Sequence, residues 1–235
     1  MVAGVTGRPL NLGLGTDASA AQVMGNWRAF RAALAPRFPS VVLSHQVHGR
    51  VVQWHPARAD GWLLLDGVDG HATAERGLLL AVTVADCVPI YLTAPGSGIV
   101  ALLHAGWRGT ANGILQRGVQ LVTERASVGV GELIMHCGVG ICGACYEVGP
   151  EVVAALAASV PSGIPAEEGP PRGTGPAHVD LRALLALQAG QLGIGEISVS
   201  PWCSAHDRDR FFSHRASAGR DGRMVAYLGR PFPPA

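Results

Sequence analysis

Two apolar runs in the middle of the chain predict buried strands over residues 79–84 and 99–103. Apolar runs of this length between turn residues are typical of strands covered on both faces. We expect a connection rich in proline and glycine to join the two strands. Asp86 and Cys87 follow the first run, and His104 follows the second. Because α/β proteins place reactive groups just beyond strand ends, these positions predict a site.

Helical spacing of Trp27 and Phe30 predicts a helix over residues 20–34, for which Asp17 or Ser19 can serve as the N-cap. The other predicted helices cover residues 112–123, 150–159 and 180–192, and the other predicted strands cover 41–43, its hairpin partner 51–54, 133–135, 197–199 and 224–228. The segment 66–73 is expected to form a loop over the site, and 162–176 to form a flexible surface loop. The pattern indicates one mixed α/β domain over residues 1–235.

Composition narrows the function classes. The net charge of +1 does not indicate a protein that binds nucleic acid or an anionic membrane. All 18 basic residues are arginine, which excludes lysine chemistry, and a tightly bound phosphate would need arginine. Five cysteines with no export signal at the N-terminus favour a cytoplasmic protein with reduced thiols.

Three residues at predicted strand ends form the most interesting set: His48, Cys87 and His104. Two imidazoles and a thiolate are ligands that zinc prefers, and three ligands with one open position are typical of a catalytic zinc site. The same residues also suit a cysteine nucleophile with a histidine base, so this alternative stays open. Arg108, near a predicted helix start, and Arg215 are candidates for holding phosphate.

Cys137, Cys142 and Cys145 have C-x4-C-x2-C spacing, with Cys203 further along the chain. This spacing occurs in plant-type [2Fe–2S] proteins, and the pair Cys142 and Cys145 could alternatively be redox-active. The distant fourth cysteine favours ordinary buried or surface thiols instead.

A series of motifs carries a family resemblance. In chain order they are SHQVHG at 44–49, ADCVPI at 85–90, HAGWRG at 104–109, YEV at 146–148, Asp180-Leu181 and FFSHR at 211–215, followed by Gly222-Arg223. Together they resemble the laccase-like polyphenol oxidase family. Its members are now better described as zinc-dependent purine nucleoside phosphorylases, some of which also act as adenosine deaminases or methylthioadenosine phosphorylases. The resemblance spans nearly the whole chain.

This resemblance implies a four-layer α/β/β/α sandwich with mixed sheets, similar to a cysteine hydrolase. It implies that His48, Cys87 and His104 are both the metal ligands and the catalytic residues, with zinc as the metal and copper as the alternative. It adds Asn11 and Asp86 to the two arginines as substrate- or phosphate-binding residues. The expected partners are purine nucleosides and phosphate, and the expected assembly is a monomer or weak homodimer.

The chain departs from the family at two places. Only residues 3–6 resemble the tail of the usual opening motif, which predicts a shortened first strand, and His214 stands where tyrosine is common. Two other functions remain as alternatives: copper-dependent phenol oxidation, and a Cys87–His104 hydrolase that edits cell-wall precursors.

Overall fold

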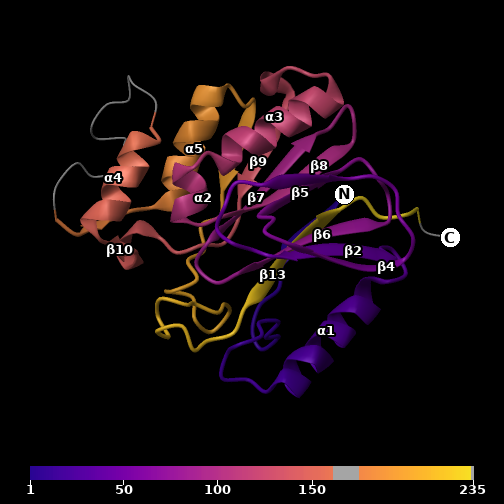
Figure 1. Ribbon diagram of the computed structural model, residues 1–235, viewed down its shortest axis with the longest axis horizontal. Coiled ribbons are helices and arrows are strands. Elements are labelled where there is room, and N and C mark those ends of the chain that lie inside the picture. Colours follow the sequence, from indigo (N-terminus) through magenta and orange to yellow (C-terminus); the bar gives the residue numbers. More distant parts are fainter. Residues whose placement is uncertain (161–174, 234–235) are drawn as a thin grey trace.

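The computed structural model describes residues 1–160 and 175–233, which build two stacked mixed sheets with helices on both outer faces (Figure 1). One sheet has the strand order β1 (Val2–Val5), β13 (Met224–Gly229), β6 (Leu78–Val84), β2 (Ser40–His45), β4 (Gly61–Asp66). The other has the order β12 (Glu196–Val199), β9 (Ile134–Cys137), β7 (Val88–Ala94), β8 (Ile99–Ala105), β5 (Gly70–Thr73), β3 (Val52–His55). A separate short pair joins β10 (Glu147–Val148) to β11 (Ala177–His178).

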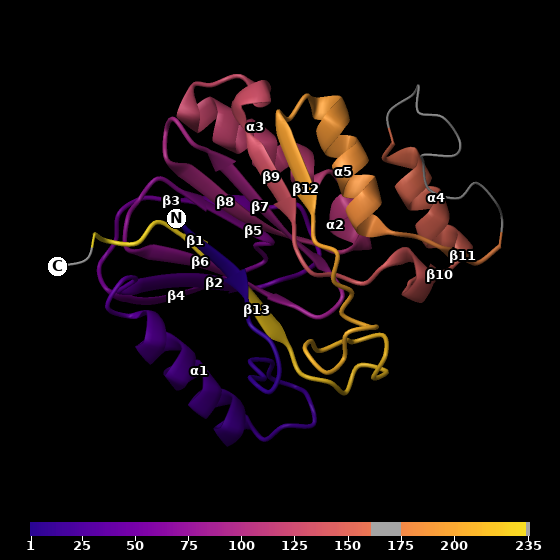
Figure 2. The same ribbon diagram turned by 180° about the vertical axis from the view of Figure 1, so that it is seen from behind.

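Helix α1 (Ala20–Leu34) covers the five-stranded sheet. The opposite outer layer lies over the six-stranded sheet and contains α2 (Trp107–Ala111), α3 (Ile114–Ala126), α4 (Pro150–Ala158) and α5 (Leu181–Leu192). Figure 2 shows the same layers from behind. The predicted α/β/β/α sandwich is therefore confirmed. Among the described residues, no helix is long and apolar enough to cross a membrane.

The central strands β6 and β8 are apolar at nearly every position because they are buried on both faces. In β6, Leu79 and Ala81 pack toward α1, while Leu80 and Val82 pack toward the second sheet. Side chains alternate across a strand, so a strand between two apolar layers needs apolar residues at every position. Burying one leucine in this way contributes roughly 1.5–3 kcal/mol. These continuous runs are what made both central strands recognisable in the sequence.

Several predicted elements match the structure closely. Helix α1 has the predicted bounds, and Ser19 is its N-cap, accepting a hydrogen bond from Gln22 N at 3.3 Å. Asp180 caps α5 by accepting from Arg182 N at 2.9 Å. The helix expected from residue 112 begins instead at Ile114, because the short helix α2 precedes it and Gly113 turns the chain at φ 84°.

Three expectations about strands are wrong. The predicted hairpin of residues 41–43 and 51–54 does not form, because β2 pairs with β4 and β6 while β3 pairs with β5 in the other sheet. The supposed connection between the two apolar runs contains a full strand, β7, despite Pro89. The supposed loop 66–73 contains β5. The turn after β2 thus carries the chain from one sheet to the other.

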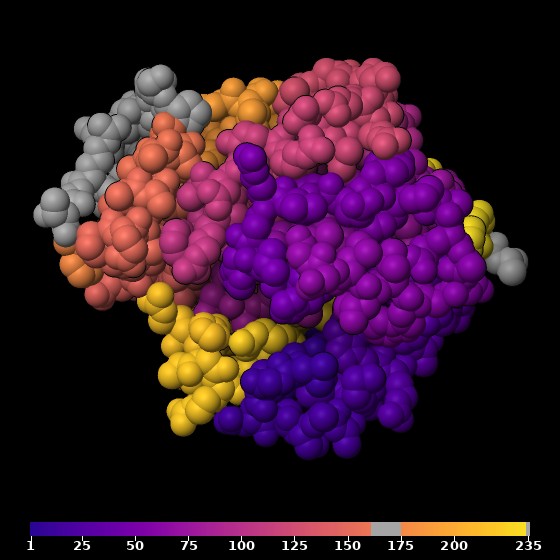
Figure 3. All heavy atoms as spheres, viewed as in Figure 1, coloured from indigo at the N-terminus to yellow at the C-terminus, as the bar shows by residue number. Residues whose placement is uncertain are grey.

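The first strand lies at the edge of its sheet, where β1 pairs antiparallel with β13. On the surface, the yellow stretch that leads into β13 lies against the indigo N-terminal part of the chain (Figure 3). Most of the loop predicted at 162–176 falls outside the described residues, and the single domain over 1–235 stays a prediction.

Candidate metal and substrate site

His48, Cys87 and His104 come together from three separate segments. His48 lies in the turn after β2, Cys87 in the short connection between β6 and β7, and His104 near the end of β8. One donor atom from each residue lies within 4.8 Å of the other two. The two imidazole rings meet edge to face, with centroids 4.9 Å apart. The structure therefore places the predicted trio in one site.

Asp69, which we did not single out from the sequence, organises this site from behind. Its buried carboxylate accepts hydrogen bonds from the backbone amides of Val47 at 3.2 Å, His48 at 2.9 Å and Gly49 at 2.7 Å. It also accepts from His104 Nδ1 at 2.9 Å, which leaves Nε2 of that ring for a ligand. One carboxylate thus positions both histidines. Such a carboxylate–histidine contact is typical behind a metal ligand.

The backbone at the site has two unusual features. His48 has a left-handed conformation with φ 58°, and the three amides bound to Asp69 hold that turn. Gly106 lies against the site, where a Cβ atom would be 2.8 Å from His48 Cδ2 and 3.1 Å from Cys87 Sγ. A side chain at position 106 would therefore displace the ligands.

Charge interactions make Cys87 a ready thiolate. Burial raises the pKa of its thiol, but the His104 imidazolium and hydrogen bonds from His104 and His48 outweigh burial and lower the pKa to about 6. Burial likewise lowers the pKa of His104, but the Cys87 sulfur and Asp69 outweigh it and raise the pKa to about 9. Although burial raises the pKa of Asp69, its hydrogen bonds to His104 and Gly49 hold it below the ordinary value. The site thus favours a negative sulfur beside a positive charge.

The residues present fit a metal ion. Two imidazoles and one thiolate suit zinc or copper, and three donors leave a coordination position open. The buried carboxylate on His104 and the lack of a side chain at Gly106 supply the support and the space that such a site needs.

The open side of the trio faces a cavity of about 430 Å³. Arg108, Arg215 and Arg223 line it together with Tyr146. The Arg215 guanidinium lies 4.9 Å from the Tyr146 ring centre, and Arg108 lies 4.3 Å from the ring centre of its neighbour Trp107. Arginine side chains held in this way can bind an anion with little loss of freedom.

The remaining predicted site residues have other surroundings. Asp86 lines the cavity, but its carboxylate accepts from Ser204 Oγ and from the Arg215 amide, each at 2.6 Å. Asn11 lies outside the residues that line the cavity, and its side-chain oxygen accepts from Arg223 N at 2.9 Å. Both residues position the arginine-bearing segment in this structure, and direct substrate contact by either one stays a prediction.

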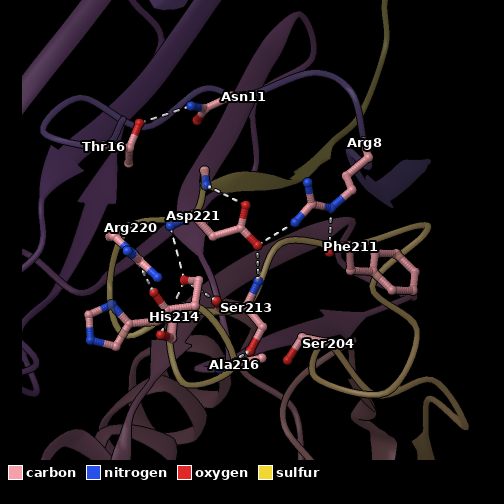
Figure 4. A network of polar contacts seen from close by, with 12 residues as sticks. Arg8, Asn11, Thr16, Ser204, Phe211, Ser213, His214, Ala216, Arg220 and Asp221 are labelled. Carbon is pink, nitrogen blue, oxygen red and sulfur yellow. Dashed lines mark hydrogen bonds and ion pairs between the residues drawn. The ribbon is translucent and has the colours of Figure 1, made fainter. Parts of the chain in front are cut away.

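A polar network shapes the loop that carries Arg215, as Figure 4 shows. Asp221 pairs with Arg8 and accepts from Ser213 N at 3.3 Å. His214 Nδ1 lies 3.2 Å from a guanidinium nitrogen of Arg223. The N-terminal segment thus holds the wall of the cavity.

Two uncharged histidines lie buried near the site. His55 Nε2 is 3.1 Å from His71 Nδ1, and His71 Nε2 is 3.3 Å from Ser44 Oγ. The Ser44 hydroxyl donates to Val68 O and therefore accepts from His71 Nε2. His71 Nδ1 is then free to accept from His55 Nε2, so one N–H proton on each ring satisfies both contacts. Burial is the main cause that lowers the pKa of His55 to about 4 and that of His71 to about 3.

The cysteine quartet suggested by the C-x4-C-x2-C spacing does not assemble. Cys137 is buried in the core, with its Sγ 4.0 Å from Arg182 O. The sulfurs of Cys142, Cys145 and Cys203 instead cluster around His206. Cys203 and His206 are separated by two residues, as are Cys142 and Cys145, and this repeated spacing was the signal that could have found the group.

Comparison with known proteins finds matches over most of the chain. Residues 4–231 match a family model described as multi-copper polyphenol oxidoreductase laccase. The chain is 38% identical over 231 residues to purine nucleoside phosphorylase YlmD of Geobacillus stearothermophilus, covering 94% of this chain and 83% of that one. The YlmD crystal structure superposes with a TM-score of 0.89 at 36% identity, over 97% of this chain and 91% of that one. Adenosine deaminase RL5, from an unknown prokaryotic organism, is 37% identical over 174 residues, covering 71% of this chain and 63% of its own length.

Proposed function

This chain belongs to the multi-copper polyphenol oxidoreductase laccase family, whose relatives include several named purine nucleoside phosphorylase, and we propose that it phosphorolyses purine nucleosides. The observation that carries the proposal is the cavity in which a Cys/His trio faces three arginines. The trio can hold a metal ion, and the arginines can hold phosphate. The relative named adenosine deaminase makes deamination of adenosine a second activity to measure.

The charge of the cavity favours an anionic co-substrate. Its lining includes the guanidinium groups of Arg108, Arg215 and Arg223, and within the described part of the chain Asp86 is its one carboxylate. Both oxygens of Asp86 already accept short hydrogen bonds, which partly neutralise it. A phosphate dianion placed there gains charge-assisted hydrogen bonds that an uncharged ligand does not.

The reaction joins a phosphate oxygen to the anomeric carbon of the ribose and breaks the glycosidic C–N bond. The proton that phosphate gives up goes to the departing base, so the products are a free purine and ribose 1-phosphate. The arginines hold and orient the attacking phosphate, and Tyr146 offers an aromatic surface in the same cavity. Zinc held by His48, Cys87 and His104 would supply a Lewis acid with one open position.

Turnover of inosine and adenosine, with and without phosphate, tests the proposal. We expect hypoxanthine and ribose 1-phosphate from inosine only when phosphate is present, and loss of turnover in Cys87→Ala. For Arg215→Met we expect the KM for phosphate to rise about 10–100-fold, the equivalent of one or two lost charge-assisted hydrogen bonds. Arg117→Met is the matched control, because that exposed side chain bonds to Gln120 on its own helix. Release of base without phosphate, or full activity in Cys87→Ala, would contradict the proposal.

A second candidate function rests on the line of contacts from Asp69 through His104 to Cys87. In a cysteine hydrolase a carboxylate orients an imidazole base, which activates a thiolate nucleophile, and Asp69, His104 and Cys87 stand in this order. Such an enzyme needs no metal, so its activity would survive chelation, whereas the phosphorylase activity that we propose would be lost and then recovered with added zinc.

A further inference from the structure

We propose that Cys142, Cys145, Cys203 and His206 form a second metal site, which binds one structural zinc ion. Donor atoms of the four residues all lie within 4.8 Å of one another. His206 contacts two of the sulfurs: its Nδ1 is 3.4 Å from Cys142 Sγ and its Nε2 is 3.2 Å from Cys145 Sγ, and one of these two nitrogens would bind the ion. Tetrahedral zinc, with bonds of about 2.3 Å to sulfur and about 2.0 Å to nitrogen, holds its donors about 3.5–3.8 Å apart. The group therefore has nearly the spacing that zinc requires.

The backbone brings these residues together as two short ligand pairs. Cys142 and Cys145 follow β9, while Cys203 and His206 follow β12, and in both pairs two residues separate the ligands. Because β9 and β12 are parallel neighbours, their following loops emerge at the same edge of the sheet. A bridge between Gly140 and Cys203 continues that contact up to the cluster.

A backbone amide points at the Cys203 sulfur. This buried Sγ accepts a hydrogen bond from Cys142 N at 3.3 Å. An N–H group that donates to sulfur matches the negative charge that a metal-bound thiolate carries. This is a second observation, separate from the spacing of the donors.

A buried ion pair orders both ligand-bearing loops. Arg182 of α5 is almost fully buried, and its Nη1 donates to Trp202 O at 2.8 Å, directly before Cys203. The same guanidinium pairs with the Asp180 carboxylate at 2.8 Å, and that carboxylate also accepts from Gly143 N at 3.2 Å, between Cys142 and Cys145. The pair therefore ties the two loops to one helix end beside the cluster.

The chemistry of the donors selects zinc in a structural role. Four protein ligands close the coordination shell, which is typical of structural zinc, whereas the trio at Cys87 leaves one position open. An all-cysteine iron–sulfur cluster does not fit, because Cys137 points into the core and an imidazole takes the fourth place.

This second site would fix one wall of the substrate cavity. Cys145 directly precedes Tyr146, and His206 lies on the segment that leads to Arg215. The Arg215 guanidinium lies over the Tyr146 ring, and its Nη1 donates to Glu147 O. Zinc would tie the two segments together beside that contact. The binding of zinc here is independent of the proposed phosphorolysis, and only the description of this wall as part of a substrate cavity rests on that proposal.

Metal content per chain tests the proposal without an activity assay. We expect about two zinc ions per wild-type chain, and about one in either Cys87→Ser or Cys145→Ser. Reconstitution with Co²⁺ separates the two sites, because thiolate-to-cobalt charge-transfer absorption grows with the number of thiolates. Cys145→Ser should lose most of that absorption, and Cys87→Ser should keep most of it. His178→Gln, an exposed histidine on β11, is the matched control and should keep both ions.

A rescue variant covers the case in which Cys145→Ser fails to fold. His206→Cys supplies a fourth thiolate, so it should fold, keep two zinc ions and show stronger Co²⁺ charge-transfer absorption than wild type. One zinc ion in wild type that Cys145→Ser retains would overturn the proposal. A disulfide among Cys142, Cys145 and Cys203, detected by mass under non-reducing conditions in freshly purified protein, would overturn it as well. Absence of nucleoside turnover with two zinc ions bound would instead count against the phosphorylase alone.

Discussion

Replacing Asp69 with asparagine is the most informative single change at the site. The carboxylate accepts four hydrogen bonds, from three backbone amides and from His104 Nδ1. Asparagine keeps one acceptor oxygen and turns the other position into a donor. In one orientation the new NH₂ group faces the amides of Val47 and Gly49, and in the other it faces His48 N and His104. Either way two of the four contacts become repulsive.

The magnitude follows from burial. Asp69 has no exposed surface, so donors that lose their acceptor there find no water in its place. Each such buried donor costs about 1–3 kcal/mol, so we expect Asp69→Asn to lower the free energy of unfolding by about 3–5 kcal/mol. Because the His48 turn and the His104 ring lose their support together, zinc affinity at the trio should fall by about 10–100-fold.

The assay combines urea denaturation of the metal-free protein with zinc competition against a chromophoric chelator. Asp66→Asn is the matched control, since that carboxylate, three residues away, is exposed and pairs with the exposed His45. We expect the control to change stability by less than about 0.5 kcal/mol. Wild-type stability and zinc affinity in Asp69→Asn would refute the role that we assign to this carboxylate.

Three further outcomes test other parts of the structure. The pKa values of His55 and His71 are lowered to about 4 and about 3, so below pH 6.5 the native state binds fewer protons than the unfolded state. The free energy of unfolding should therefore fall by about 2 kcal/mol for each histidine between pH 7 and pH 5. A urea midpoint that does not change over this range would contradict the buried neutral pair. Gly106→Ala should reduce zinc binding at Cys87, measured by the same chelator competition, while secondary structure by circular dichroism stays unchanged; unaltered affinity would show that the ligands have room to move. Asp86→Ala should lower the free energy of unfolding by about 3 kcal/mol, because the buried Ser204 hydroxyl and the part-buried Arg215 amide lose their acceptor and alanine must adopt φ 85°. Thermal denaturation unchanged from wild type would exclude that role.

Elements with a strong local pattern were predictable. Helix α1 follows from its apolar spacing and its Ser19 cap, and β6 and β8 follow from apolar runs that no exposed element could tolerate. The exposure of His48 followed from the glycine after it, and the structure shows the left-handed turn there. Local sequence determines these features because the interactions that create them act within a few residues of one another.

Pairing between distant segments was not predictable in the same way. Strands β2 and β3 look like a hairpin in the sequence, but the partners of β2 are β4 and β6, which only the stacking of two sheets selects. Strand β7 was missed because a proline usually interrupts a strand. In this structure Pro89 lies near the start of the strand, where it is tolerated. The resemblance to a known family supplied the layered arrangement that local patterns could not.

The chain by itself determined which chemistry is available: thiolates, imidazoles and arginines, with no lysine. Tertiary structure alone decided which of these groups meet. It placed Asp69 behind both histidines of the trio. It also brought His206, and not Cys137, to the cluster of Cys142, Cys145 and Cys203. The physical reason is that a side chain's partners depend on strand register and layer packing, which are set by burial over the whole fold rather than by neighbours in sequence.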